Sequence, residues 1–186
     1  DLHAGQIQGF FDIPVDNLFT TPIFARYIRK NVKSKNLICV SPDAGAIERT
    51  RGLATKVNAD LAIIDKRRPE PGKSKVMNII GNVKGKDCMI IDDIIDSGGT
   101  IINAADALIK KGARSVHVFI THAVLSGDAI NKIQKSKIKK LIITDTIDNS
   151  KKIKKASKIE VLSIAQLMAE AIKRISNSTS VSSLFN

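Results

Sequence analysis

The feature that most constrains the fold is an apolar run that leads into three acidic residues and then a pair of glycines. Residues 88–91 read Cys-Met-Ile-Ile, Asp92, Asp93 and Asp96 follow, and residues 97–100 read Ser-Gly-Gly-Thr before a helical pattern begins. A buried strand, a glycine turn and a helix in this order are typical of open parallel sheets, whose ligands lie beyond the carboxyl ends of the strands. The sequence therefore predicts an α/β fold with a ligand site at this turn.

The remaining chain shows the alternation of repeated β-α units, because short β-branched runs alternate with longer amphipathic ones from Leu37 onward. The predicted strands cover residues 37–40, 61–64, 87–92, 115–121 and 140–144, and the predicted helices cover 43–57, 100–111, 126–134 and 163–175. Gly112 suits a left-handed end for the second helix. We expect residues 66–75 to form an exposed, mobile loop and 176–183 to be extended. This order predicts a doubly wound, mostly parallel sheet with helices on both faces.

Composition narrows the class of protein. The 186 residues are 43% hydrophobic and 26% charged, which excludes a disordered chain and allows one sizeable core. With no leader and no long apolar run visible, we expect a cytoplasmic protein with no membrane partner.

The formal net charge is +12, but the densest basic stretch, residues 132–158, interleaves Lys with Ile and has no aromatic residue. We interpret it as solvated surface and expect no nucleic-acid partner. Cys39 and Cys88 lie in apolar runs and are expected to be buried free thiols.

The turn after residue 91 predicts a specific kind of ligand. Amides at a helix N-terminus bind anions, and glycines let the backbone approach a phosphate closely. Asp92 and Asp93 would repel that phosphate, so they need sugar hydroxyls, bound directly or through a cation. A phosphate beside a diol describes a pentose 5-phosphate. The alternative is that Asp96 or Ser97 only caps a helix, although capping needs one acid and not three.

This loop resembles the phosphoribosyl-diphosphate loop of the type I phosphoribosyltransferase superfamily, and the whole chain resembles the ribose-phosphate pyrophosphokinase family within it. The supporting stretches are DLHAGQIQGFF at 1–11, DIPVD at 12–16, SPDAG at 41–45, DKRRP at 65–69 and SVSSLF at 180–185. The resemblance implies transfer of the diphosphoryl group of ATP to the 1-hydroxyl of ribose 5-phosphate, giving phosphoribosyl diphosphate and AMP for nucleotide biosynthesis. It also implies Mg²⁺ as the metal, ATP as a substrate and a homo-oligomer, typically a hexamer of dimers.

The resemblance assigns functions to individual residues. The residues that would bind ribose 5-phosphate are Asp92, Asp93, Asp96, Ser97, Gly98, Gly99 and Thr100. His3 would bind ATP and, together with Asp43, the metal, and the cations Lys66 and Arg68 would be catalytic. An allosteric site would include Ser180, Ser182 and Phe185. Taken alone, His3 would be an ordinary surface or core histidine, Asp43 a helix cap, and residues 66–68 solvated loop charges. The Pro- and Gly-rich stretch that follows favours a closing lid instead.

The chain also departs from the family. Ala46 and Glu48 stand where the family has a second glycine and a lysine, so the resemblance supports no phosphate contact by that turn. The chain corresponds to the C-terminal half of the family's two-domain protein. We therefore expect residues 1–18 to be the tail of a missing N-terminal domain, 19–170 a phosphoribosyltransferase-like domain that binds ribose 5-phosphate, and 171–186 a segment that packs on the missing domain.

Two alternatives remain open at this point. A base phosphoribosyltransferase would need a hood over the base, which the sequence does not show. A non-catalytic regulatory relative that binds phosphoribosyl compounds would have no need of a lid or a metal ligand, so Lys66, Arg68, His3 and Asp43 argue for the catalyst.

Overall fold

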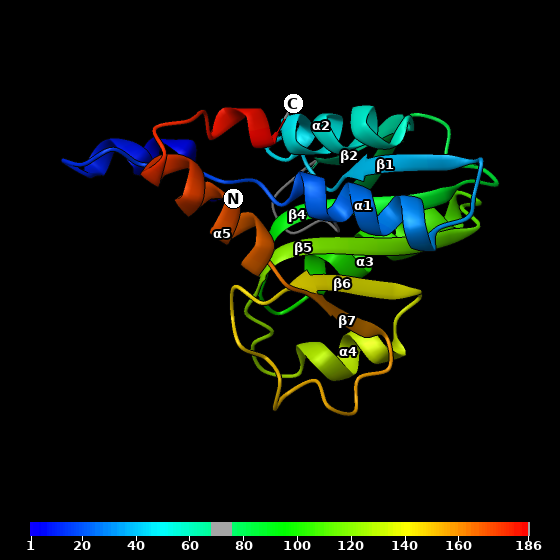
Figure 1. Cartoon of the computed structure of the whole chain (residues 1–186). Helices are drawn as coiled ribbons and strands as arrows, with labels where there is room; N and C mark the ends of the chain where they lie inside the picture. The colour runs from blue at the N-terminus through cyan, green and yellow to red at the C-terminus, as the bar shows by residue number, and fades with distance from the viewer. Residues whose placement is uncertain (68–75, 186) are drawn as a thin grey trace.

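The protein is built around one seven-stranded sheet. A computed structural model describes residues 1–67 and 76–185 (Figure 1). The strand order is β3-β2-β1-β4-β5-β6-β7, with β3 antiparallel to β2 and every other pair parallel. The strands are β1 Leu37–Ser41, β2 Asp60–Arg67, β3 Val76–Ile80, β4 Asp87–Ile95, β5 Ser115–Ala123, β6 Lys140–Thr144 and β7 Ile159–Leu162.

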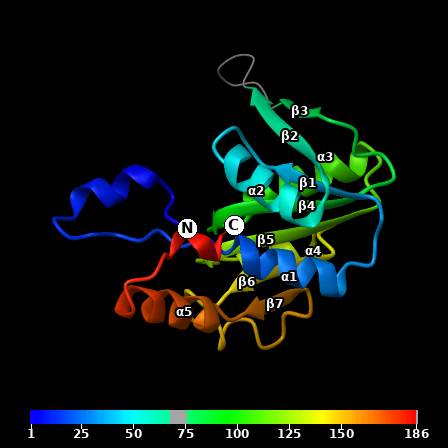
Figure 2. The same cartoon turned by 45° about the horizontal axis from the view of Figure 1, so that its top comes forward.

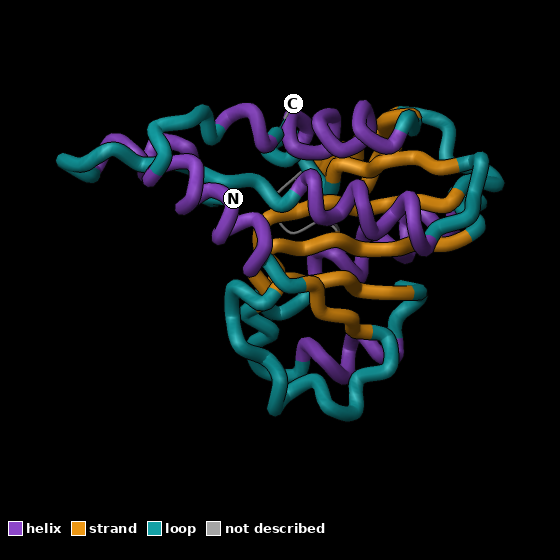
Figure 3. Tube along the Cα trace, in the orientation of Figure 1, coloured by secondary structure: helices purple, strands orange, loops and turns teal. Residues whose placement is uncertain are grey.

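Helices cover both faces of this sheet (Figure 3). They are α1 Thr21–Asn31, α2 Ile47–Val57, α3 Gly99–Lys110, α4 Ala129–Lys135 and α5 Ala165–Ser176, with the 3₁₀ helices η1 Gly5–Phe10 and η2 Ser182–Leu184. One apolar cluster joins α1 and α2 to one face of the sheet, and a second joins α3 and α4 to the other. The doubly wound α/β fold expected from the sequence is confirmed.

Alternate residues of the central strands enter the two clusters. On β4, Met89 packs toward α1 and α2, whereas Ile90 packs toward α3 and α4, and both are fully buried. Strands covered on both faces are apolar almost throughout, which explains the unbroken run that the sequence shows at 88–91. β4 is therefore the central strand from which the conspicuous loop leaves.

Two sequence predictions need correction at strand ends. β4 was expected to end at Asp92, but it continues to Ile95, because Ile94 and Ile95 pair with β5. Asp93 therefore belongs to the strand, as Asp92 was expected to, and does not follow it. β2 likewise continues past the expected residue 64 to Arg67, since Lys66 and Arg67 pair with β3. Residues 66 and 67 are thus strand and not loop, and residues 68–75 lie outside the described part of the chain.

Other elements were not expected from the sequence at all. They are α1, β3, β7, η1 and η2. Residues 176–183, expected to be extended, instead contain the end of α5 and the start of η2. The left-handed turn at Gly112 is confirmed, with φ of +89°.

Residues 5–16 form an arm that projects from the domain beside α5 and the C-terminal segment (Figures 1 and 2). Phe10 is 87% exposed and Ile13 69% exposed on this arm. Within the described residues, no helix combines the length and the apolar character needed to cross a membrane.

Candidate active site

A cleft of about 570 Å³ opens where β1 and β4 lead into the helices that follow them. Its lining includes nearly all the residues that the sequence placed at the ligand, namely His3, Asp43, Asp92, Asp93, Asp96, Ser97, Gly98, Gly99 and Thr100. Lys66 belongs to β2 by its backbone, and Arg68 lies outside the described residues. Ser180, Ser182 and Phe185 lie elsewhere, in the C-terminal segment, where Phe185 packs edge-on against Phe19 at 5.6 Å.

The glycine turn delivers helix amides to one end of the cleft. Gly98 caps α3 in the left-handed region with φ of +77°, and Gly99 is the first helical residue. A Cβ atom at Gly99 would meet no other atom within 4 Å, so the backbone there is open to the cleft. The segment after β5 braces the turn, because Val124 N donates to Ile95 O at 2.9 Å and Ser126 N donates to Asp96 O at 3.3 Å. This end of the cleft suits an anion.

A pair of adjacent carboxylates occupies the other end. Asp93 is buried and Asp92 half-buried, and Asp93 N donates to Asp92 Oδ1 at 3.0 Å. Burial raises the pKa of Asp92 to about 7, and the hydrogen bond and charge of Asp93 add to the rise. Burial also acts to raise the pKa of Asp93, but hydrogen bonds with Asp92 and His3 and the charge of Arg49 outweigh it and lower that pKa. The two carboxylates therefore titrate as a coupled pair, in which Asp93 is favoured as the ionised member.

His3 reaches this pair from the start of the chain. Its Nδ1 lies 2.8 Å from Asp93 Oδ2, and its side chain is 76% exposed. One ring nitrogen is thus fixed by a carboxylate while the rest of the ring faces the opening of the cleft. This arrangement orients the imidazole for a ligand that arrives from solvent.

Asp43 lies on the turn between β1 and α2. Its Oδ1 accepts a hydrogen bond from Ala46 N at 3.2 Å, and Ser41 Oγ donates to its carbonyl at 2.6 Å. The turn is therefore ordered by local hydrogen bonds, one of them to the Asp43 carboxylate, but Asp43 does not cap α2, whose N-cap is Ala46 and has no side-chain hydrogen bond. Its carboxylate nevertheless also lines the cleft.

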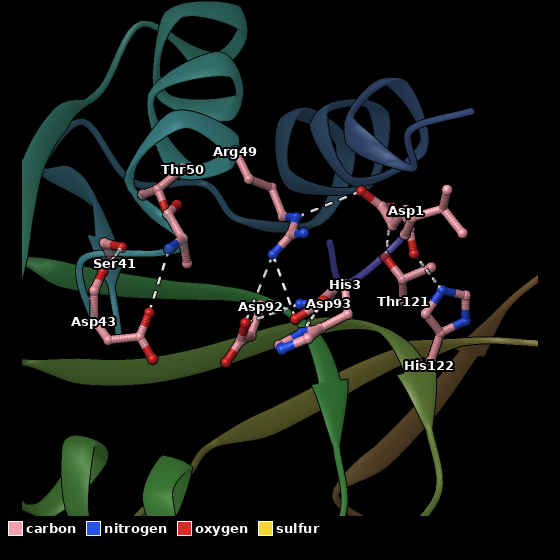
Figure 4. A network of polar contacts seen from close by, with 12 residues as sticks. Asp1, His3, Ser41, Asp43, Arg49, Thr50, Asp92, Asp93, Thr121 and His122 are labelled. Carbon is pink, nitrogen blue, oxygen red and sulfur yellow. Dashed lines mark hydrogen bonds and ion pairs between the residues drawn. The ribbon is translucent and has the colours of Figure 1, made fainter. Parts of the chain in front are cut away.

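Arg49 was not assigned to the site from the sequence, although it lies at its centre (Figure 4). It lies in the first turn of α2, and its Nη1 is 3.4 Å from Asp93 Oδ1 and 3.6 Å from Asp92 Oδ1. On its other side, Nε lies 3.4 Å from Asp1 Oδ1. One guanidinium therefore stands among three carboxylates.

Asp1 was also missed. Its carboxylate is almost completely buried, and Oδ2 accepts hydrogen bonds from Thr20 Oγ1 and Thr121 Oγ1 at 2.7 Å each and from Thr20 N at 3.0 Å. His122 Nε2 lies 2.7 Å from the Asp1 carbonyl oxygen (Figure 4). A signal was present in the sequence, since Asp1 is two residues from His3 in the same family-like stretch.

The carboxylates of the cleft would hold a metal ion only together with a bound substrate that supplies further ligands. Among the residues that the structure describes, no three His, Cys, Asp or Glu side chains are grouped closely enough to hold a metal. Mg²⁺ commonly takes one or two protein carboxylates and fills its other positions with water and substrate phosphates. The Asp43 carboxylate matches that mode of binding, and His3 in the same cleft would add a nitrogen ligand, which is less usual for Mg²⁺.

Comparisons with known proteins identify the family of the chain. Residues 68–186 match the family model described as "Phosphoribosyl synthetase-associated domain". The chain is 56% identical over 186 residues to a Brucella melitensis protein named ribose-phosphate pyrophosphokinase, and 57% identical over 187 residues to a Mesorhizobium japonicum protein of the same name. These matches cover 100% of this chain and 60% of each relative.

A solved structure gives the same result. The crystal structure of phosphoribosylpyrophosphate synthetase from Mycobacterium smegmatis superimposes with a TM-score of 0.84 at 35% identity, covering 96% of this chain and 57% of that one. The chain thus spans about three fifths of the length of the relatives it matches. It belongs to the phosphoribosyl synthetase-associated domain family.

Proposed function

We propose that the complete protein is a ribose-phosphate diphosphokinase, which transfers the diphosphoryl group of ATP to the 1-hydroxyl of ribose 5-phosphate. The products would be phosphoribosyl diphosphate and AMP, for nucleotide biosynthesis. One observation carries the proposal: a single cleft has helix amides at 98–100 at one end and the Asp92–Asp93 pair at the other. The names of the relatives support the same reaction.

Ribose 5-phosphate would bind along this loop. Its phosphate would accept hydrogen bonds from the amides at the start of α3 and from Ser97 and Thr100, where the helix dipole favours negative charge. Its hydroxyls would donate to Asp92 and Asp93, which are ligands for a diol and would repel a second phosphate. Asp96, exposed on the turn between these groups, would complete the binding of the sugar.

ATP would approach from the side of His3 and Asp43. These two residues would hold Mg²⁺ together with the ATP phosphates, and the bound cation would neutralise charge that otherwise repels the attacking hydroxyl. The hydrogen bond between His3 and Asp93 supports an arrangement in which the nucleotide would bind next to the sugar, so both substrates would meet in one cleft. Such positioning is the main task of a protein that transfers phosphoryl groups.

Lys66 and Arg68 are proposed as the cations that stabilise the transferring group. Lys66 is near the end of β2, directly before residues 68–75. Charge develops on the non-bridging phosphate oxygens during transfer, and cations placed there stabilise the transition state more than the bound substrates. Removing one such donor typically costs about 3–4 kcal/mol of transition-state stabilisation.

The exposed apolar arm fits a proposal about the rest of the protein. Residues 1–18 and 171–186 would pack on a further domain, covering Phe10 and Ile13, and the assembled protein would be a cytoplasmic homo-oligomer. Ser180, Ser182 and Phe185 would contribute to a regulatory site in that assembly. Ser180 Oγ and Ser182 Oγ lie 2.9 Å apart, which gathers two hydroxyls for an anionic effector.

The products distinguish this function from its alternatives. The complete protein, supplied with ATP, ribose 5-phosphate and Mg²⁺, is expected to release AMP. Attack of the ribose 1-hydroxyl on the β-phosphorus would break the bridge between the α- and β-phosphates, so that the diphosphoryl group passes to the sugar and AMP is the leaving group. An ordinary kinase would release ADP instead. Release of neither nucleotide by a folded protein would contradict the proposal and favour a non-catalytic regulatory relative.

A further inference from the structure

The guanidinium of Arg49 is held by charge and not by hydrogen bonds. Its contacts with Asp1, Asp92 and Asp93 measure 3.4, 3.6 and 3.4 Å. Arg49 Nε and Asp1 Oδ1 are both buried, and neither has a hydrogen-bond partner among residues 1–67 and 76–185. A cation that has closed on one carboxylate would lie nearer 2.8 Å from it and engage both oxygens. The position of Arg49 is therefore a balance between Asp1 on one side and the Asp92–Asp93 pair on the other.

Asp1 is anchored independently of the cleft. It does not line the cleft, and the two threonines that bind its carboxylate come from the end of β5 and the residue before α1. Thr121 is held in turn, because its carbonyl accepts hydrogen bonds from Thr144 Oγ1 at 2.6 Å and Thr146 Oγ1 at 2.9 Å. A buried carboxylate fixed by three hydrogen bonds is a stationary negative charge (Figure 4).

We infer that Asp1 is a positioning residue for the ribose site, which acts by drawing Arg49 back from Asp92 and Asp93. This inference rests on the proposed binding of ribose 5-phosphate. Without the charge of Asp1, the guanidinium would close on the two cleft carboxylates and form the short, paired hydrogen bonds that Arg makes with such groups. The carboxylate oxygens would then be occupied, and the hydroxyls of the sugar would have to displace Arg49 in order to bind.

The same strand supplies a matched control. At the opposite end of β4, buried Asp87 pairs with Arg114, whose Nε donates to Oδ1 at 2.9 Å, and Ser115 Oγ donates to the same oxygen at 2.7 Å. This pair is also a buried aspartate with an arginine and a hydroxyl, but it is remote from the cleft. Asp87→Asn therefore tests the loss of a buried carboxylate that is paired with a half-exposed arginine, at a site remote from Arg49.

The test compares wild type, Asp1→Asn, Thr121→Val and Asp87→Asn in the complete protein. Calorimetric titration gives the dissociation constants of ribose 5-phosphate and of Mg·ATP, and thermal unfolding gives Tm. Asp1→Asn is expected to raise the dissociation constant of ribose 5-phosphate by about tenfold, the usual effect of removing a residue that orients a binding group. Thr121→Val keeps the charge but loosens its anchor, so its rise should be smaller. Mg·ATP binding should change by less than twofold in both.

The control separates positioning from stability. Asp87→Asn should lower Tm at least as much as Asp1→Asn and leave the dissociation constant of ribose 5-phosphate unchanged. Unchanged ribose 5-phosphate binding by folded Asp1→Asn would overturn the inference. So would a loss of Mg·ATP binding in Asp1→Asn as large as its loss of ribose 5-phosphate binding, or a loss of ribose 5-phosphate binding in Asp87→Asn as large as that in Asp1→Asn.

A wild-type protein that binds ribose 5-phosphate but forms no AMP would refute the proposed reaction and leave the positioning test valid. A wild type that does not bind the sugar phosphate would refute both.

Discussion

Gly99→Ala should separate ligand binding from stability. Gly99 begins α3, and an added Cβ would meet no atom within 4 Å, so the protein itself accommodates a methyl group there. Since alanine is favoured over glycine inside helices, we expect the variant to be as stable as wild type or more stable by about 0.5–1 kcal/mol. That open space belongs to the cleft, where the backbone must approach the phosphate closely. The affinity for ribose 5-phosphate should therefore fall at least tenfold, equivalent to about 1.4 kcal/mol.

Gly85→Ala is the matched control for this prediction. Gly85 also has no atom within 4 Å of an added Cβ, but its φ of +71° lies in the left-handed region and it is outside the cleft. We expect it to lose about 1–2 kcal/mol of stability and to retain wild-type affinity. Urea denaturation gives the free energy of unfolding, and calorimetric titration with ribose 5-phosphate gives the affinity. Wild-type affinity in Gly99→Ala would refute the placement of the phosphate at this turn.

Three further predictions concern the scaffold. Gly81→Ala should lose about 2–4 kcal/mol in urea denaturation, because Gly81 has φ of +110° and an added Cβ would lie 2.9 Å from that of Ala62. Hydrogen bonds from Arg114 lower the pKa of Asp87 in the folded protein. The ionised Asp87 therefore adds its full contribution to stability above pH ~4 and loses it as the pH falls further. The pH profile of the stability of Asp87→Asn should lack this acid loss. Burial raises the pKa of Cys39 and of Cys88 to about 12, so a thiol reagent at pH 8 should react only after unfolding; rapid reaction of the folded protein would contradict this.

Local patterns were sufficient to predict the fold and the loop. The alternation of β-branched runs and amphipathic segments predicted the parallel core, and the acids and glycines of 92–100 predicted the cleft lining. Both signals are local, because a strand buried on two faces is apolar throughout and a tight turn needs glycine. Strand ends were less predictable, since Ile94 and Ile95 continue β4 only because β5 is long enough to pair with them.

The missed parts depend on contacts between distant residues. β3 is defined by its antiparallel pairing with β2 across residues 68–75, and no local pattern fixes that register. Asp1 reaches Thr20 and Thr121 across 19 and 120 residues of sequence, so no local pattern shows that its carboxylate is buried, although its place two residues before His3 could have drawn attention to it. Arg49 lies in a helix turn where an arginine is usually solvated. α1 did have a local signal, because Pro22 stands in its first turn before an amphipathic segment.

The most direct test of the account is a calorimetric titration of the protein with ribose 5-phosphate and Mg²⁺, beside an Asp96→Asn control. Asp96 is exposed on the turn and lines the cleft, so this substitution should leave the fold intact. The account predicts saturable binding with one site per chain, and loss of most of that binding in Asp96→Asn. Equal binding by both proteins, or no binding by a folded wild type, would contradict the assignment of residues 92–100 as the sugar-phosphate site.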